Sequence, residues 1–126
     1  MPKAVAIYLR LSQEDVDIRR NAAKDESNSI SAQRSLITAH IEEMPDLRNL
    51  PRMEFCDDGF SGTNFSRPDF QRMIELTREG EIGCIVVKDL SRFGREYAQM
   101  GMYIEHYFEE KGVRFISVAE NFDSLT

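Results

Sequence analysis

The sequence predicts a single α/β domain with a mainly parallel central sheet of four to five strands flanked by helices. Its 126 residues fit the length of one domain, and with 41% hydrophobic and 30% charged residues the chain can bury one core. Four short β-like runs alternate with three amphipathic helical stretches, a pattern typical of parallel strands joined by covering helices.

The strands are expected where apolar residues run together. The first, Ala4–Leu9, is apolar at nearly every position, as in a strand covered on both faces. The others are expected at Met53–Cys56, Cys84–Val87 and Val113–Val118. The chain then stops within what is expected to be a loop, Asn121–Thr126, so we expect a piece of a longer protein.

Three helices are predicted from apolar residues at helical spacing. The first begins near Ser29 and ends before Pro45, the second opens at Pro68 and closes at Gly80, and the third stops at Gly112. Their apolar stripes are expected to be ordinary core faces: Ile30, Ile37, Ile41 and Met44; Phe70, Met73, Ile74 and Thr77; Tyr97, Met100, Gly101, Ile104 and Phe108.

Two segments do not fit this scheme of short connections. Glu14–Asn28 is long, polar and mixed in charge, and we expect a mobile loop there. Asp57–Ser66 contains two glycines and small polar residues and is expected to be a second irregular loop. The adjacent acids Asp57 and Asp58 would then simply face water.

Composition excludes several classes of protein. No stretch approaches the roughly 20 apolar residues of a membrane span, and the N-terminus lacks a signal-peptide layout, so a cytosolic location is expected. The two cysteines, Cys56 and Cys84, lack metal-ligand spacing and are expected to be core thiols. The net charge of −6 and pI near 4.9 argue against strong DNA binding by this piece alone.

Candidate functional residues follow the predicted strands, where ligands of open α/β sheets gather. Arg10 and Ser12 follow the first strand and should project on the same side if extension continues. Arg67 comes directly before the second helix, and Arg92 and Arg95 follow the third strand about one helical turn apart. Parallel strands would bring these residues to one edge of the sheet.

Such a cluster favours phosphate chemistry. Arginine offers a permanently charged fork that matches phosphate oxygens, and several together can balance a phosphoryl transition state. A serine among them can attack the phosphate and form a covalent intermediate if its proton is accepted. His40 and His106 lie inside helical patterns and are expected to be structural or exposed, so arginine assistance or water would have to serve.

Three runs of the chain carry a family resemblance. They are Tyr8-Leu9-Arg10-Leu11-Ser12, then Ser61-Gly62 followed by Arg67-Pro68, then Leu90-Ser91-Arg92-Phe93-Gly94-Arg95, and Gln33 resembles the glutamine of the first helix. Together they resemble the motifs of the serine recombinase (resolvase/invertase) catalytic domain, in order, over positions 4 to 118. Gly59–Phe65 and Asp89–Arg92 are more similar to large serine recombinases and related transposases than to small resolvases.

The resemblance implies a resolvase-like fold and site-specific cleavage and rejoining of double-stranded DNA. Ser12 would attack the backbone to give a 5′-phosphoserine link and a free 3′-hydroxyl, after which strands exchange and the reaction reverses. Arg10, Arg67, Arg92 and Arg95 would neutralise the phosphate, and Gln33 would help to position groups around it. No metal or cofactor is implied.

The resemblance also implies further parts of the protein. Residues 1–126 would be the N-terminal catalytic domain, truncated before a long dimerisation helix and C-terminal DNA-binding domains. The full protein would form dimers and tetramers, and the isolated piece would be inactive or weak. Small resolvases carry an acidic residue just before the first arginine of the third motif, where this chain has Ser91, with Asp89 two positions earlier; no role is transferred to Asp89.

Ordinary interpretations compete for each of these residues. Ser12-Gln13-Glu14-Asp15 resembles a capping box, which would make Ser12 a helix N-cap. Arg92 and Arg95 fit a solvated helix face. Arg67 fits an ion pair with Asp69 or Glu75 of the second helix, and Gln33 fits a helix surface.

Two rival functions therefore stay open. One is a non-enzymatic, flavodoxin-like module that binds a phosphorylated ligand or a partner protein through the arginines. Under that hypothesis Ser12→Ala leaves affinity intact and no covalent adduct forms. The other is a degenerate recombinase domain that is retained for assembly.

Overall fold

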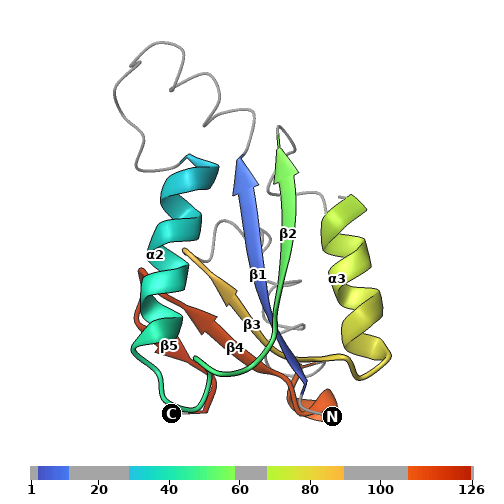
Figure 1. Cartoon of the computed structure of the whole chain (residues 1–126). Helices are drawn as coiled ribbons and strands as arrows, with labels where there is room; N and C mark the ends of the chain where they lie inside the picture. The colour runs from blue at the N-terminus through green and yellow to red at the C-terminus, as the bar shows by residue number, and fades with distance from the viewer. Residues whose placement is uncertain (1–2, 12–28, 59–67, 90–107, 126) are drawn as a thin grey trace.

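A five-stranded sheet lies between helices in the computed structural model (Figure 1). The structure describes residues 3–11, 29–58, 68–89 and 108–125. In chain order the elements are β1 (Ala4–Leu11), α2 (Ile30–Glu42), β2 (Arg52–Asp58), α3 (Pro68–Arg78), β3 (Ile82–Val87), α6 (Phe108–Lys111), β4 (Arg114–Ser117) and β5 (Phe122–Asp123). The predicted α/β class with a mainly parallel sheet is confirmed.

The strand order is β2-β1-β3-β4-β5. The pairs β1·β2, β1·β3 and β3·β4 are parallel, and only β4·β5 is antiparallel. The chain leaves β1 for β2 on one side and then returns to place β3 on the other side of β1. The order of strands thus reverses at β1, and in open α/β sheets such a reversal marks the ligand-binding crevice at the carboxyl ends.

Alternate residues of β1 supply two separate cores. Ala6 and Tyr8 belong to a cluster that contains Phe70 and Met73 of α3 together with Phe108 of α6. The opposite face belongs to a second cluster: Val5, Ile7 and Leu9 with Ile37 and Ile41 of α2. Because strand side chains alternate between faces, α2 and α3 cover opposite sides of the sheet, as Figure 1 shows.

The predicted helix boundaries hold where the structure describes them. Ser29 is the N-cap of α2, and its hydroxyl accepts a hydrogen bond of 3.0 Å from the Ala32 N–H. α3 begins at Pro68, and the chain reverses at Gly80, whose φ of +84° is a left-handed conformation that favours glycine. The third predicted helix is described only at Phe108–Lys111; the rest lies outside the described residues.

Two expectations about loops were wrong. β2 continues through Asp57 and Asp58, so these acids end a strand rather than open a loop. The C-terminal stretch is not only loop, because Phe122–Asp123 adds strand β5 through antiparallel pairing with β4. The predicted loop at Glu14–Asn28 lies outside the described residues.

Candidate active site

Three neighbouring strand ends form the candidate site. β1 lies between β2 and β3, and the pairs Arg10↔Asp57 and Tyr8↔Val87 fix how far each strand reaches. Because all three strands are parallel, the segments that follow them begin at the same edge of the sheet, which we call the carboxyl edge. Of the predicted site residues, the structure describes two, Arg10 and Gln33.

The other four predicted site residues lie outside the described residues, so their positions stay predictions. Their chain neighbours nevertheless have known places. Ser12 follows the last residue of β1, and Arg67 precedes the first residue of α3. Arg92 and Arg95 follow β3 by five and eight positions, counted from Val87.

Arg10 is buried at the end of β1, with no exposed surface. It lies two residues beyond Tyr8, so it shares the sheet face that α3 covers. In register it lies opposite Asp57 of β2. A guanidinium is always charged, and burying a charge is costly unless an anion compensates for it. The carboxyl edge therefore holds a fixed positive charge from β1.

Gln33 fastens the backbone of Arg10 to helix α2. Its side-chain Nε2 donates to the Arg10 carbonyl at 3.0 Å, and its Oε1 accepts from the Arg10 N–H at 3.3 Å. The pairing of β1 with β3 ends at Tyr8 and Val87, so Arg10 lies beyond the end of β3. The Gln33 amide bonds to the N–H and the carbonyl of Arg10 there. Gln33 is fully buried, and the interpretation as an ordinary surface residue was wrong.

Asp57 is a buried residue of this edge that the sequence interpretation missed. Only 3% of it is exposed, and its carboxylate accepts hydrogen bonds from the Tyr8 hydroxyl at 2.8 Å and from the N–H groups of Asp69 at 3.0 Å and Phe70 at 2.9 Å. It does not face water, because these donors replace water. The sequence held one signal: Phe55 and Asp57 continue a strand alternation, both buried.

The described histidine and acids provide little further chemistry at this edge. His40 is half-buried in α2, and His106 lies outside the described residues. Over the described ranges, no group of three or more His, Cys, Asp or Glu side chains is arranged to hold a metal ion.

Within the same ranges, no helix is both long and apolar enough to cross a membrane.

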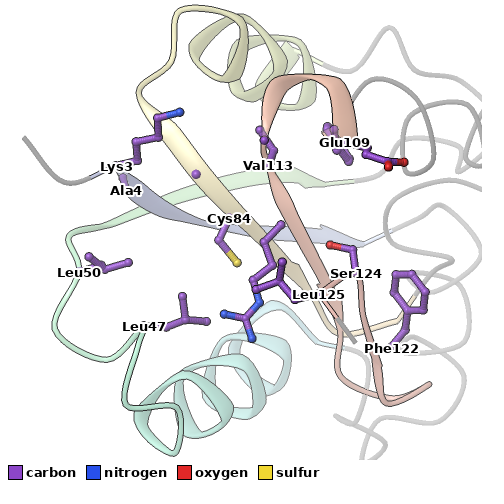
Figure 2. A pocket seen from close by; sticks show the side chains of 14 residues that line it. Lys3, Ala4, Leu47, Leu50, Cys84, Glu109, Val113, Phe122, Ser124 and Leu125 are labelled. Carbon is purple, nitrogen blue, oxygen red and sulfur yellow. The ribbon is translucent and has the colours of Figure 1, made fainter.

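One cavity of the described part lies at the other edge of the sheet (Figure 2). It measures about 750 Å³ and is lined by residues at the amino ends of strands, among them Ala4, Cys84 and Arg114, and by Leu47 and Leu50 of the connection before β2. Because parallel strands separate their amino and carboxyl ends, this cavity is remote from the candidate site.

The two cysteines differ in how far they are buried. Cys84 is buried, and burial raises the pKa of its thiol to about 12, so it stays protonated and unreactive. Cys56, expected to be a core thiol, is only half-buried on β2. Its backbone N–H donates to Asp69.

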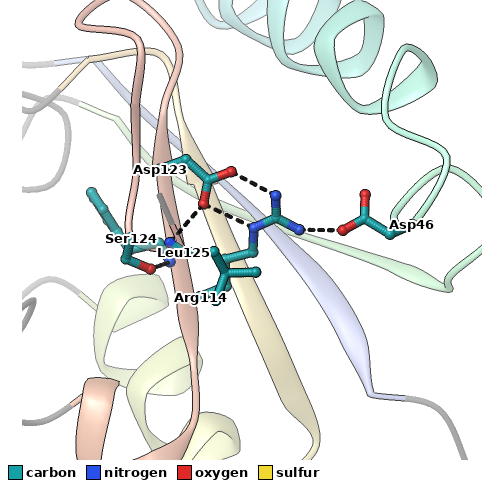
Figure 3. Close-up of polar contacts among 6 residues, drawn as sticks. Asp46, Arg114, Asp123, Ser124 and Leu125 are labelled. Carbon is teal, nitrogen blue, oxygen red and sulfur yellow. Dashed lines mark hydrogen bonds and ion pairs between the residues drawn. The ribbon is translucent and has the colours of Figure 1, made fainter.

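Arg114, the first residue of β4, holds together the edge of the sheet at which the parallel strands begin, which we call the amino edge (Figure 3). Its guanidinium binds both carboxylate oxygens of Asp123 at 2.9 and 2.5 Å, and it also reaches Asp46 at 2.5 Å. The bidentate partner holds the pKa of Asp123 below its ordinary value. β4, β5 and the connection after α2 are thereby joined, which is a structural role.

Comparison with known proteins decides the family. The family model for the resolvase N-terminal domain matches residues 5–126, nearly the whole chain. The chain belongs to the resolvase family. The Tn917 transposon resolvase of Enterococcus faecalis is 35% identical over 66 residues, which are 52% of this chain and 34% of that protein. This resolvase-family chain thus spans about a third of the length of that curated relative.

Several solved structures share the fold. The N-terminal catalytic domain of TP901-1 integrase superposes with a TM-score of 0.77 at 26% identity, covering 98% of this chain and 83% of that one. A resolvase-family site-specific recombinase from Streptococcus pneumoniae gives 0.71 at 25% identity, covering 99% and 78%. The C-terminal catalytic domain of the serine recombinase ISC1926 TnpA, at 20% identity and a TM-score of 0.66, covers 91% and 70% and supports the fold alone.

Proposed function

We propose that this resolvase-family domain catalyses site-specific DNA recombination through a covalent phosphoserine intermediate. One observation carries the proposal: the parallel ends of β1, β2 and β3 lie side by side, with Arg10 buried there and its backbone fixed by Gln33. The segments carrying Ser12, Arg67, Arg92 and Arg95 begin or end at this edge. The chemistry of these residue types fits a single backbone phosphate.

In the proposed reaction the Ser12 hydroxyl oxygen attacks a DNA phosphorus atom. A bond forms between that oxygen and phosphorus while the bond from phosphorus to the 3′-oxygen breaks. The serine proton is given up, and the departing 3′-oxygen takes up a proton to become a free 3′-hydroxyl. The 5′-phosphate stays on Ser12. Attack by the 3′-hydroxyl of an exchanged strand reverses these steps and releases the serine.

The arginines stabilise the charge that develops on the phosphate. Arg10 contributes from β1, Arg67 from the start of α3, and Arg92 and Arg95 from the segment after β3. Preorganised donors in a partly buried site act mainly on the transition state. We therefore expect Arg92→Ala and Arg95→Ala to slow cleavage more than they weaken DNA affinity. Equal losses of rate and affinity would mean that these residues only anchor DNA.

We further propose that this domain acts within a longer protein. The net charge of −6 disfavours DNA binding by this domain alone, because phosphate contacts dominate such affinity. The match covers 34% of the curated relative, so that protein extends beyond the matched segment. DNA-binding domains and a dimerisation helix would follow, double-strand exchange would require a tetramer, and the isolated domain would be weak or inactive.

The test is a covalent adduct assay with the full protein and duplex DNA that carries its recombination site. After denaturation, the wild type should retain labelled DNA on the protein, and Ser12→Ala should retain none. Ser35→Ala, an exposed serine of α2, is the matched control and should behave as the wild type. Adducts that form equally well with Ser12→Ala would disprove the nucleophile. DNA or ligand binding without any adduct would favour the rival binding module.

A further inference from the structure

The cavity at the amino edge of the sheet has the size of a small-molecule site (Figure 2). Its volume of about 750 Å³ falls within the range of roughly 300–1,000 Å³ that ligand pockets occupy. The space exists because both strands that line it carry small residues near their starts: Ala4 in β1, and Gly83 and Cys84 in β3. The Cys84 thiol is buried and protonated, so it presents an apolar surface.

Larger apolar side chains surround these small residues. Leu47 and Phe108 line the cavity and are themselves buried. Phe122 and Leu125 line it too, but they stay 38% and 70% exposed. The described residues have one other large apolar side chain that is exposed, Leu36, and it does not line the cavity. Exposed apolar surface gathered beside a cavity is typical of a binding site.

The charged side chains of the lining favour an anionic group at one place. They are Lys3, Glu109 and Arg114. Arg114 is bound by the carboxylates of Asp123 and Asp46, so its charge is compensated. Within the described residues, no carboxylate pairs with the Lys3 ammonium. Figure 2 shows Glu109 well apart from Lys3. An anion is therefore complementary to the cavity at Lys3 and would be repelled at Glu109.

Gly83 determines where the Lys3 side chain lies. A Cβ added at Gly83 would come within 2.9 Å of the Lys3 Cβ and 3.3 Å of its Cδ. Real Cβ atoms essentially never approach other atoms more closely than 3.0 Å, so a side chain at position 83 would displace Lys3. The bare glycine lets the hydrocarbon stem of Lys3 lie against β3, while its charged end stays in water beside the cavity.

We infer that this cavity binds a small apolar molecule that carries one carboxylate. The hydrocarbon part lies against Leu47, Cys84 and Leu125, and the carboxylate lies at the Lys3 ammonium. One acidic group is expected rather than two, because Glu109 repels a second. The inference is independent of the proposed reaction, since the cavity lies at the amino edge and the reaction would take place at the carboxyl edge.

The test is a titration of the ¹⁵N-labelled chain with octanoate, followed by NMR. The amide signals of Ala4, Leu47 and Cys84 should move and saturate, with a dissociation constant of about 1 mM or lower, while those of Arg10 and Asp57 at the carboxyl edge stay in place. Shortening the ligand to hexanoate should weaken binding about twofold to fourfold for each methylene removed. Octan-1-ol, the neutral counterpart, should bind less tightly than octanoate.

Lys3→Gln tests the anionic end of the ligand. The change keeps most of the stem and removes the charge of an exposed residue, so it does not endanger folding. It should weaken octanoate binding about twofold to fivefold, as expected for an exposed ion pair, and leave octanol binding unchanged. Lys111→Gln is the matched control, because Lys111 is an exposed lysine of α6 that does not line the cavity. It should bind both ligands as the wild type does.

Leu125→Ser tests the apolar end of the ligand. It should weaken octanoate and octanol alike, about twofold or more, because part of the apolar contact is lost. Leu36→Ser is the matched control, since it removes an exposed leucine that lies on α2 and not in the cavity lining. Equal affinities in these two variants would show that the ligand does not contact Leu125 and would refute the assigned position.

The remaining outcomes also decide. Octanol that binds the wild type as tightly as octanoate would overturn the inference, because the site would then have no preference for an anion. Signals that move throughout the chain without saturating would mean non-specific association with an amphipathic molecule, and no movement up to about 10 mM octanoate would mean that the cavity stays empty of it; either result contradicts the inference. If dilution of the free chain moves the same signals, a second copy fills the cavity and the assigned ligand class is wrong.

Discussion

The side chain of Gln33 provides the sharpest stability prediction. Its amide makes two hydrogen bonds with the backbone of Arg10, and both partners are buried. Gln33→Met keeps nearly the same length and removes both the donor and the acceptor. The Arg10 N–H and carbonyl would then lose these two hydrogen bonds in the protein interior.

The size of the effect follows from these two groups. A buried polar group that loses its partner costs about 1–3 kcal/mol. Two such groups, less some gain from burying the methionine, should lower the free energy of unfolding by about 2–4 kcal/mol. Domains of this kind are stable by only about 5–15 kcal/mol, so the loss is large.

Urea denaturation followed by circular dichroism measures this loss on the chain itself. Gln71→Met in α3 is the control, because Gln71 is exposed and the same change there should cost less than about 0.5 kcal/mol. The slope of free energy against urea should be equal in both variants. A cost for Gln33→Met no larger than that for Gln71→Met would refute the role assigned to Gln33.

Three other predictions concern the amino edge and one turn. Asp123→Asn should destabilise the chain by about 1.5–3 kcal/mol at neutral pH, because Arg114 loses a charged hydrogen-bond partner. Since Arg114 lowers the pKa of Asp123, that stabilisation is present above the ordinary value of 3.8 and is lost as the pH falls below it, so urea titrations of wild type and variant should converge in acid. A thiol reagent at about pH 8 should label half-buried Cys56 in the folded chain and label Cys84 only when the chain unfolds. The reason is that burial raises the pKa of the Cys84 thiol to about 12. Equal labelling rates for the two cysteines in the folded chain would contradict this prediction. Gly80→Ala should lower the free energy of unfolding by about 1 kcal/mol, because the φ of +84° at this position disfavours a side chain even though nothing lies within 4 Å of the added Cβ. Thermal or urea unfolding measures this loss, and an unchanged stability would show that the turn adapts.

The sheet and its covering helices were predictable because their signals are local. Continuous apolar residues marked β1, and the helical spacing of Ile37 and Ile41 marked the buried face of α2. Ser29 and Pro68 fixed the starts of two helices through capping and φ restriction. The two-residue strand β5 is too short to show a strand period, so its sequence predicts a loop.

The details of the carboxyl edge depend on contacts between distant parts of the chain. The sequence predicts a solvent-facing loop residue at Asp57, because an acid beside another acid and a glycine usually is one. Its donors, the Tyr8 hydroxyl and the Phe70 N–H, lie 49 and 13 positions away in sequence, so no local pattern records them. Family resemblance predicts a site role for Gln33, but its two hydrogen bonds to Arg10, 23 positions away in sequence, appear only in the structure.

The central claim is that one DNA phosphate is held jointly by residues from three strand ends. A crystal structure of the full protein with its DNA, captured before cleavage, would measure this. We predict the Ser12 hydroxyl oxygen in line for attack at about 3–3.5 Å from a single phosphorus atom, with guanidinium groups around the same phosphate: those of Arg10, Arg67, Arg92 and Arg95. A complex in which Ser12 and these arginines contact separate phosphates, or in which Ser12 lies away from the DNA, would contradict the account.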